Sequence, residues 1–194
     1  MIGTPGRYAR NGKRHKEQKP SKKAAVVCAW VPGRRCGDVA VCAIGLRVNG
    51  TDSEPIGIYW AVSKAPAKGD FVFALPPAAP IFNLALARGY LAAGPSPAGT
   101  CGLIKQVAAL SGDRVTIGVQ GVQVNGVLLK NSAPRPADAA GRPLPAYELS
   151  DYALRSEEVL LMSDYNPASF DGRYFGPLSK TTIQSAILPV ITWK

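Results

Sequence analysis

The chain has 194 residues, among them 20 glycines and 17 prolines, and it carries a formal net charge of +10. This length fits a single domain with a tail, and many short valine-rich runs between glycines and prolines favour a mainly β fold over a helical one. The only histidine is His15, in the basic N-terminal stretch, and no CxxC or Cys/His spacing occurs. The sequence therefore excludes a structural zinc site and a Ser-His-Asp triad in the folded part.

The positive charge is concentrated at the N-terminus. Eight of the 23 Lys and Arg residues, but only one of the 13 acids, lie in residues 1–23, which predicts a basic disordered tail. The two apolar runs within residues 24–48 are separated by a segment that contains Arg34, Arg35 and Asp38. A membrane-spanning helix needs about 20 apolar residues, and a charge at the bilayer centre costs about 2.5–3.5 kcal/mol. We therefore interpret residues 24–48 as a degenerate anchor or signal-like segment.

From residue 56 onward, short apolar runs bounded by Gly, Pro, Asn and Asp predict a series of strands. Apolar residues at helical spacing over 80–93, with Pro80 near the start, predict one amphipathic helix. Asn125-Gly126 predicts a tight hairpin turn, and the Pro- and Ala-rich residues 131–150 predict a surface excursion. In chain order, the predicted strands cover residues 56–62, 70–75, 103–110, 115–119, 122–124, 127–129, 158–163 and 183–190.

The four cysteines divide into two groups. Cys28, Cys36 and Cys42 lie in the N-terminal segment, whereas Cys101 lies alone in the predicted folded part. We expect Cys101 to be a small buried apolar residue.

Lys105 lies in an apolar run, between Leu103 and Val107. Poor solvation disfavours the ammonium form and lowers the pKa of a lysine, and a neutral lysine can act as a general base beside a nucleophile. The candidate nucleophile is Ser53, in a turn whose backbone Pro55 makes rigid. The ordinary alternatives are a turn serine and an edge-strand lysine whose amine reaches water.

Four sequence blocks resemble the type I signal peptidase superfamily, in particular its plasmid-conjugation branch, the TraF-type serine peptidases. The resemblance extends from about Asn49 to the end of the sequence, and the blocks occur in the order that the family shows. They are Asn49-x-Thr51-x-Ser53-x-Pro55-x-Gly57-x-Tyr59, Lys68-Gly69-Asp70 followed by Pro76-Pro77, the Lys105 block ending in Gly112-Asp113, and Phe170-Asp171 to Gly176-Pro177.

The resemblance implies a signal-peptidase-like domain of antiparallel β-sheets over residues 49–194, with one short helix. It implies that Ser53 attacks the scissile carbonyl and that Lys105 is the general base, a serine–lysine variant of the catalytic triad. Arginine could not replace Lys105 in this role, because a guanidinium does not lose its proton. The position of Thr51 implies that its hydroxyl contributes to the oxyanion hole, together with the backbone N–H of Ser53.

The fourth block supplies the supporting residues that the resemblance implies. Asp171 and Arg173 form an ion pair that holds the lysine strand in place, and Ser169 hydrogen-bonds the Lys105 amine. This chain has Asp-Gly-Arg where relatives commonly have Asp-Ser-Arg. Gly172 therefore removes a hydroxyl, and we expect this difference to adjust the activity of the site rather than to abolish it.

The function that the resemblance implies is the processing of secreted precursors by a Ser53–Lys105 dyad. In the TraF-type branch the precursor is a conjugative pilin subunit, matured for plasmid transfer and type IV secretion by removal of a signal peptide or propeptide, or by cyclisation. No metal or organic cofactor is implied. The implied partners are a precursor protein and the bacterial inner membrane, with the catalytic domain in the periplasm. The sequence does not indicate an oligomeric state.

Two alternatives remain. A non-catalytic β-domain could bind a nucleic acid or a pilus partner through the basic tail. A self-cleaving repressor-type protease would bind DNA, but residues 1–48 show no helix-turn-helix pattern and no Ala-Gly cleavage linker precedes the domain. Nucleic acid is therefore not an expected partner of the peptidase.

Overall fold

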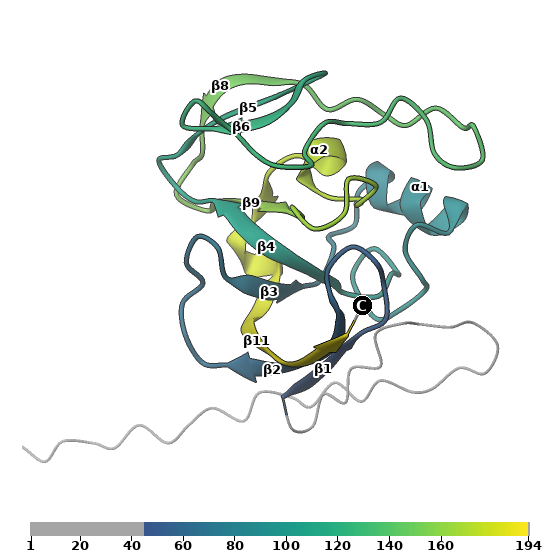
Figure 1. Ribbon diagram of the computed structural model, residues 1–194, viewed down its shortest axis with the longest axis vertical. Helices are drawn as coiled ribbons and strands as arrows, with labels where there is room; N and C mark the ends of the chain where they lie inside the picture. The colour runs from purple at the N-terminus through teal and green to yellow at the C-terminus, as the bar shows by residue number, and fades with distance from the viewer. Residues whose placement is uncertain (1–44, 194) are drawn as a thin grey trace, which may run out of the picture.

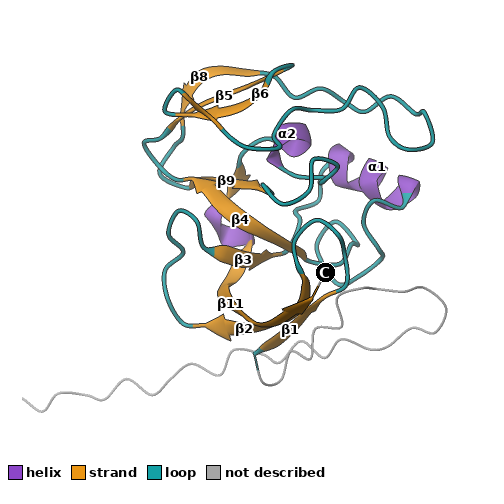
Figure 2. Ribbon diagram, viewed as in Figure 1, coloured by secondary structure: helices purple, strands orange, loops and turns teal. Residues whose placement is uncertain are grey.

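The computed structural model describes residues 45–193, which form two antiparallel β-sheets and two α-helices (Figures 1 and 2). The larger sheet has seven strands in the order β1-β2-β11-β3-β4-β9-β10, and the smaller has four in the order β7-β6-β5-β8. The mainly β, antiparallel prediction is confirmed. The strands of the larger sheet are β1 (Leu46–Asn49), β2 (Ile56–Val62), β3 (Phe71–Ala74), β4 (Leu103–Ala109), β9 (Glu158–Met162), β10 (Leu178–Ser179) and β11 (Ile183–Trp193). Those of the smaller sheet are β5 (Arg114–Gly118), β6 (Gly121–Val124), β7 (Val127–Leu128) and β8 (Leu149–Ala153).

The larger sheet joins the two ends of the described chain. Strand β11 inserts between β2 and β3, with Ile187 opposite both Ala61 and Phe71. Strand β1 pairs with β2 and begins at Leu46, inside the range predicted as an anchor or signal-like segment. The predicted tail and the rest of that segment lie outside the described residues. Within residues 45–193, no helix has both the length and the apolar character needed to cross a bilayer.

Helix α1 (Pro80–Arg88) confirms the predicted helix but ends earlier than residue 93. Gly89 adopts the left-handed conformation (φ 77°), which ends the helix because the backbone N–H groups then turn back to bond the last carbonyls. The second helix, α2 (Gly172–Phe175), was not predicted, and Asp171 caps it by accepting from the Arg173 N–H.

The smaller sheet contains the predicted turn. Asn125 and Gly126 both have positive φ (52° and 79°) between β6 and β7, as a two-residue hairpin turn requires. Strand β8 begins at the end of the range predicted as a surface excursion. The sequence did not predict it because its polar residues show no apolar alternation. The rest of the excursion runs past α1 (Figure 1).

Three apolar clusters hold these elements together. One packs both helices against the larger sheet, a second lies between the two sheets, and a third groups residues of β2, β3, β4 and β11. Strand β4 contributes to all three, so it is buried along most of its length. This position explains why the Lys105 side chain is only 1% exposed.

Candidate active site

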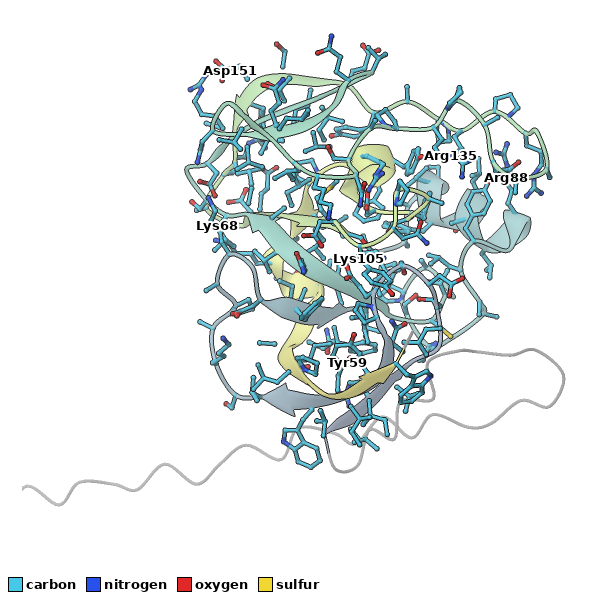
Figure 3. All side chains as sticks on the ribbon, in the orientation of Figure 1. Tyr59, Lys68, Arg88, Lys105, Arg135 and Asp151 are labelled. Atoms are coloured by element: carbon cyan, nitrogen blue, oxygen red, sulfur yellow. The ribbon has the colours of Figure 1, made fainter. Side chains whose placement is uncertain are left out.

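A cleft of about 690 Å³ opens between the turn before β2, the segment after α1 and the start of β4. Thr51, Ser53, Lys105 and Ser169 all line it. Figure 3 places Lys105 near the middle of the molecule, with Arg88 and Arg135 to one side of it. The structure therefore brings four of the six predicted site residues to one cavity. The other two, Asp171 and Arg173, do not line it and are fully buried.

The turn that carries Ser53 is organised by Asn49, a buried residue at the end of β1. The Asn49 side-chain amide donates to the carbonyl oxygens of Glu54 (2.9 Å) and Pro55 (3.1 Å). Its Oδ1 accepts from the backbone N–H of Thr51 (3.1 Å) and from the Thr51 hydroxyl (2.9 Å). One side chain thus joins both ends of the turn and fixes the backbone around Ser53.

The hydroxyls of Thr51 and Ser53 lie 3.1 Å apart. Because the Thr51 proton is donated to Asn49, the Ser53 hydroxyl is the donor in this contact. An oxyanion role for Thr51 would require its hydroxyl to turn away from Asn49, so this role stays a prediction.

The loop after β9 holds the same turn from the other side. The Ser163 hydroxyl donates to the Ser53 carbonyl oxygen, and the Asn166 side chain donates to the Asp52 carbonyl oxygen (3.0 Å). Residues separated by more than 100 positions in the sequence therefore define one backbone conformation. Neither Ser163 nor Asn166 stood out in the sequence, since an isolated Ser or Asn near a turn is common.

Asp171 and Arg173 form a fully buried ion pair with two parallel bonds, Nε to Oδ1 (2.7 Å) and Nη2 to Oδ2 (2.8 Å). Asp171 also accepts from the Ser163 N–H (3.0 Å), and Arg173 donates to the Ser163 carbonyl oxygen (3.2 Å). The remaining guanidinium nitrogen donates to the carbonyl oxygens of Asn131, Ala133 and Pro167. The described contacts of this pair thus position Ser163, and through it the Ser53 turn, rather than the lysine strand itself.

Lys105 lies on β4 opposite Val72 of β3. It is among the largest fully buried side chains of the described residues, so it is not the water-reaching edge lysine of the ordinary alternative. Lys105 lines the same cleft as Ser53.

Glu54 is the charged residue of the site that the sequence reading missed. It follows Ser53, its side chain is 0% exposed, and neither carboxylate oxygen has a hydrogen-bond partner among the described residues. Burial raises the pKa of Glu54 to about 8, against the opposing charge of Lys105. A glutamate in a turn next to proline suggests an exposed side chain, so only the fold reveals its burial.

One prediction from the fourth block differs from the structure, and the structure adds a further role for Gly172. The Ser169 hydroxyl is buried but makes no hydrogen bond with any described residue, so the bond to the Lys105 amine is not formed. At Gly172, an added Cβ would lie 2.7 Å from Leu160 Cδ1 and 2.8 Å from the Leu161 carbonyl oxygen. The glycine therefore has a steric role, beyond the loss of a hydroxyl.

Cys101 is 6% exposed, as expected, and it also lines the cleft. It is disulfide-bonded, which goes beyond the predicted role of a small apolar residue. Within residues 45–193, no cluster of three or more His, Cys, Asp or Glu side chains could hold a metal ion.

Residues 40–192 match the family described as "Signal peptidase, peptidase S26", and the chain belongs to this family. It is 49% identical over 151 residues to a plasmid transfer protein TraF of Escherichia coli, an alignment that covers 78% of this chain and 85% of the relative. It is 34% identical over 178 residues to a conjugal transfer protein TraF of Agrobacterium fabrum (strain C58), with 89% and 98% covered. Among solved structures, a signal peptidase I from Enterococcus faecalis V583 aligns with a TM-score of 0.37 and 17% identity, over 66% of this chain and 100% of that one.

Proposed function

We propose that this protein is a serine endopeptidase in which Ser53 is the nucleophile and Lys105 the general base. The observation that carries the proposal is one cleft lined by a serine in a rigid turn and by a deeply buried lysine, in a member of the signal peptidase family. A lysine held away from water is the kind of lysine that can be neutral and accept a proton.

In the proposed reaction, Lys105 takes the Ser53 proton as the hydroxyl oxygen attacks the scissile carbonyl. The lysine then gives this proton to the leaving amine and an acyl-enzyme remains. A second nucleophile releases the acyl group in the same way. Water as this nucleophile gives hydrolysis, whereas an amine of the same precursor gives a cyclic product. The backbone N–H of Ser53 and the Thr51 hydroxyl are the proposed oxyanion donors, and losing one such donor typically lowers the rate about a hundred- to a thousand-fold.

The proposed substrate is a precursor protein of a plasmid transfer system, most specifically a conjugative pilin subunit. The names of the E. coli and Agrobacterium relatives support a role in plasmid transfer. The membership of the signal peptidase family supports a precursor protein as the substrate. We also propose that the domain lies in the periplasm at the inner membrane.

The test is to co-express the chain with a pilin precursor and to compare product masses. Ser53→Ala and Lys105→Arg should both abolish the cleaved or cyclic product while the protein stays folded by circular dichroism. Lys68→Arg is the matched control, because Lys68 is half-exposed in a surface ion pair with Asp113, a contact that arginine can keep. Full activity of Lys105→Arg would exclude the general-base role. Normal plasmid transfer with Ser53→Ala would instead support the non-catalytic binding domain.

A further inference from the structure

Three arginines line the cleft together with Ser53 and Lys105, and the proposed mechanism uses none of them. Arg88 is the last residue of α1, whereas Arg135 and Arg142 belong to the connection between β7 and β8. Figure 3 places Arg88 and Arg135 on the same side of Lys105. Arg142 lies beside Arg88, because its guanidinium donates to the Arg88 carbonyl oxygen (3.3 Å). Two segments that are distant in the sequence thus bring positive charges to one side of the cleft.

Asp138 is the acid on this side of the cleft, and its hydrogen-bonding capacity is already used. Its Oδ2 accepts from the Arg142 Nε (2.6 Å) and from the Tyr90 hydroxyl (2.6 Å). Its Oδ1 accepts from the backbone N–H groups of Ala140 (3.0 Å) and Arg142 (2.9 Å). A carboxylate offers about four acceptor positions, so these four bonds fill them. Asp138 therefore balances the charge of Arg142 and leaves the other two arginines without a carboxylate.

Arg88 and Arg135 are held in place by uncharged groups. The Arg88 Nη1 donates to the Pro143 carbonyl oxygen (2.7 Å) and to the Tyr90 hydroxyl (3.3 Å). The backbone N–H of Arg135 donates to the hydroxyl of Tyr174 (2.9 Å), whereas its exposed side chain forms no ion pair with any described residue. A guanidinium in this state presents N–H donors in a planar fork that fits a carboxylate.

The charge along the cleft also changes sign. Asp52 is the other acid among the described residues that line it, and it directly precedes Ser53. An acidic group of a substrate would be repelled beside Asp52, whereas it would be attracted beside Arg88 and Arg135. The cleft therefore favours a peptide with neutral residues at Ser53 and a negative charge at the arginines.

We propose that Arg88 and Arg135 form a subsite for a carboxylate of the precursor, at a position separate from the peptide bond that Ser53 attacks. The carboxylate belongs to an acidic side chain or to the C-terminus of the precursor, because both present the same group. This inference rests on the proposed function, since the occupant is a peptide only if the cleft binds the precursor. Charge-assisted hydrogen bonds from a guanidinium are about twice as strong as neutral ones, so this subsite selects among precursors.

The test measures peptide binding by NMR of the full chain with ¹⁵N-labelled arginine, in the Ser53→Ala variant so that no peptide is cleaved. The probes are three acetylated alanine hexapeptides whose fifth residue is Glu with a C-terminal amide, Gln with an amide, or Gln with a free C-terminal carboxylate. At least one carboxylate peptide should bind about three- to ten-fold more tightly than the neutral one and shift the Nε–Hε signals of Arg88 and Arg135. Adding Arg135→Gln should remove this preference. Arg155→Gln is the matched control and should keep it, because Arg155 is exposed between β8 and β9 and does not line the cleft.

The outcomes separate the subsite from the peptidase. Equal binding of all three peptides, or a preference that survives Arg135→Gln, would overturn the subsite. Arg135→Gln is the decisive variant, because Arg88→Gln also removes the bond to the Pro143 carbonyl oxygen. The carboxylate peptide that binds more tightly shows whether a side chain or the C-terminus is the source. Carboxylate binding that depends on Arg135, without precursor cleavage by the wild type, would count against the proposed peptidase and not against the subsite.

Discussion

At the scale of single residues, the site is marked by ionisable side chains placed out of water. Glu54, Lys105, Asp171 and Arg173 are each at most 1% exposed. The Asp171–Arg173 pair satisfies its hydrogen-bonding groups internally, whereas Glu54 does not. The Asp171–Arg173 pair therefore supports the structure, whereas burial raises the pKa of Glu54 to about 8.

Breaking the buried ion pair should destabilise the protein strongly. Asp171→Asn leaves the Arg173 guanidinium without its counter-charge, and the expected loss is about 3–5 kcal/mol of unfolding free energy. Urea unfolding followed by circular dichroism measures it. Asp151→Asn is the control, since Asp151 pairs with Arg114 at the surface and its loss should change stability little. Equal small effects of both variants would show that burial does not set the strength of these pairs.

The sequence and the resemblance predicted Ser53 and Lys105 as candidate site residues, and the structure brings both to one cleft. The oxyanion role of Thr51 stays a prediction. The burial of Glu54 could not be predicted, because it depends on Tyr59, Lys105 and the loop after β9 closing around a turn that looks exposed in the sequence.

At the scale of elements, the connection from β9 to α2 positions the site. Its residues hold the Ser53 turn through Ser163 and Asn166, and it ends in the Asp171 cap of α2. Gly172 lets the first turn of α2 approach the β9 backbone closely. The resemblance drew attention to this glycine through a missing hydroxyl, but the reason for it is the space between the two elements.

Gly172→Ala should destabilise the protein by about 1–3 kcal/mol, because an added methyl group would push against the Leu161 carbonyl oxygen. Thermal or urea unfolding measures the change. Gly118→Ala in β5 is the matched control, because nothing lies within 4 Å of its added Cβ. The control should be neutral or slightly stabilised, and the same result at Gly172 would mean that α2 shifts freely.

The predictions of helices, strands and turns were correct where the local sequence signal was strong. Asn125-Gly126 and the apolar runs of β2 and β4 specify their structures through turn geometry and burial. Helix α1 was predicted too long, because the apolar spacing continued past Gly89. Strands β1 and β8 were not predicted as such, since each is short and gains its stability from pairing with a neighbour, β1 with β2 and β8 with β5.

At the scale of the whole molecule, one face of the larger sheet exposes apolar side chains. The pairing of β11 with β2 places Leu188, Ile191 and Trp193 opposite Trp60, Ile58 and Ile56, so these six share one face. Trp60, Leu188, Ile191 and Trp193 are between 44% and 59% exposed. An exposed apolar surface with two tryptophans is suited to the boundary between lipid and water, which supports the proposed location at the membrane.

The double variant Trp60→Ser and Trp193→Ser should therefore bind lipid vesicles several-fold more weakly than the wild type, because the aromatic contact with the lipid interface is lost. Co-sedimentation with vesicles of mixed neutral and anionic phospholipids measures binding. The double variant Val127→Ser and Leu128→Ser is the control, as these apolar residues of the smaller sheet are even more exposed than the two tryptophans. Weakening of similar size in both double variants would contradict a specific membrane face.

The sequence by itself determined the mainly β class, the tight turn at Asn125-Gly126 and, through four short blocks, the family and its two central candidates. These features depend on local backbone preferences or on motifs that stay close in the chain. Only the tertiary structure decided the burial of Glu54, the role of Asp171 and Arg173 in holding Ser163, the steric need for Gly172 and the apolar face of β2 and β11. Each of these arises from segments that are distant in the sequence and meet only when the strands pair and exclude water.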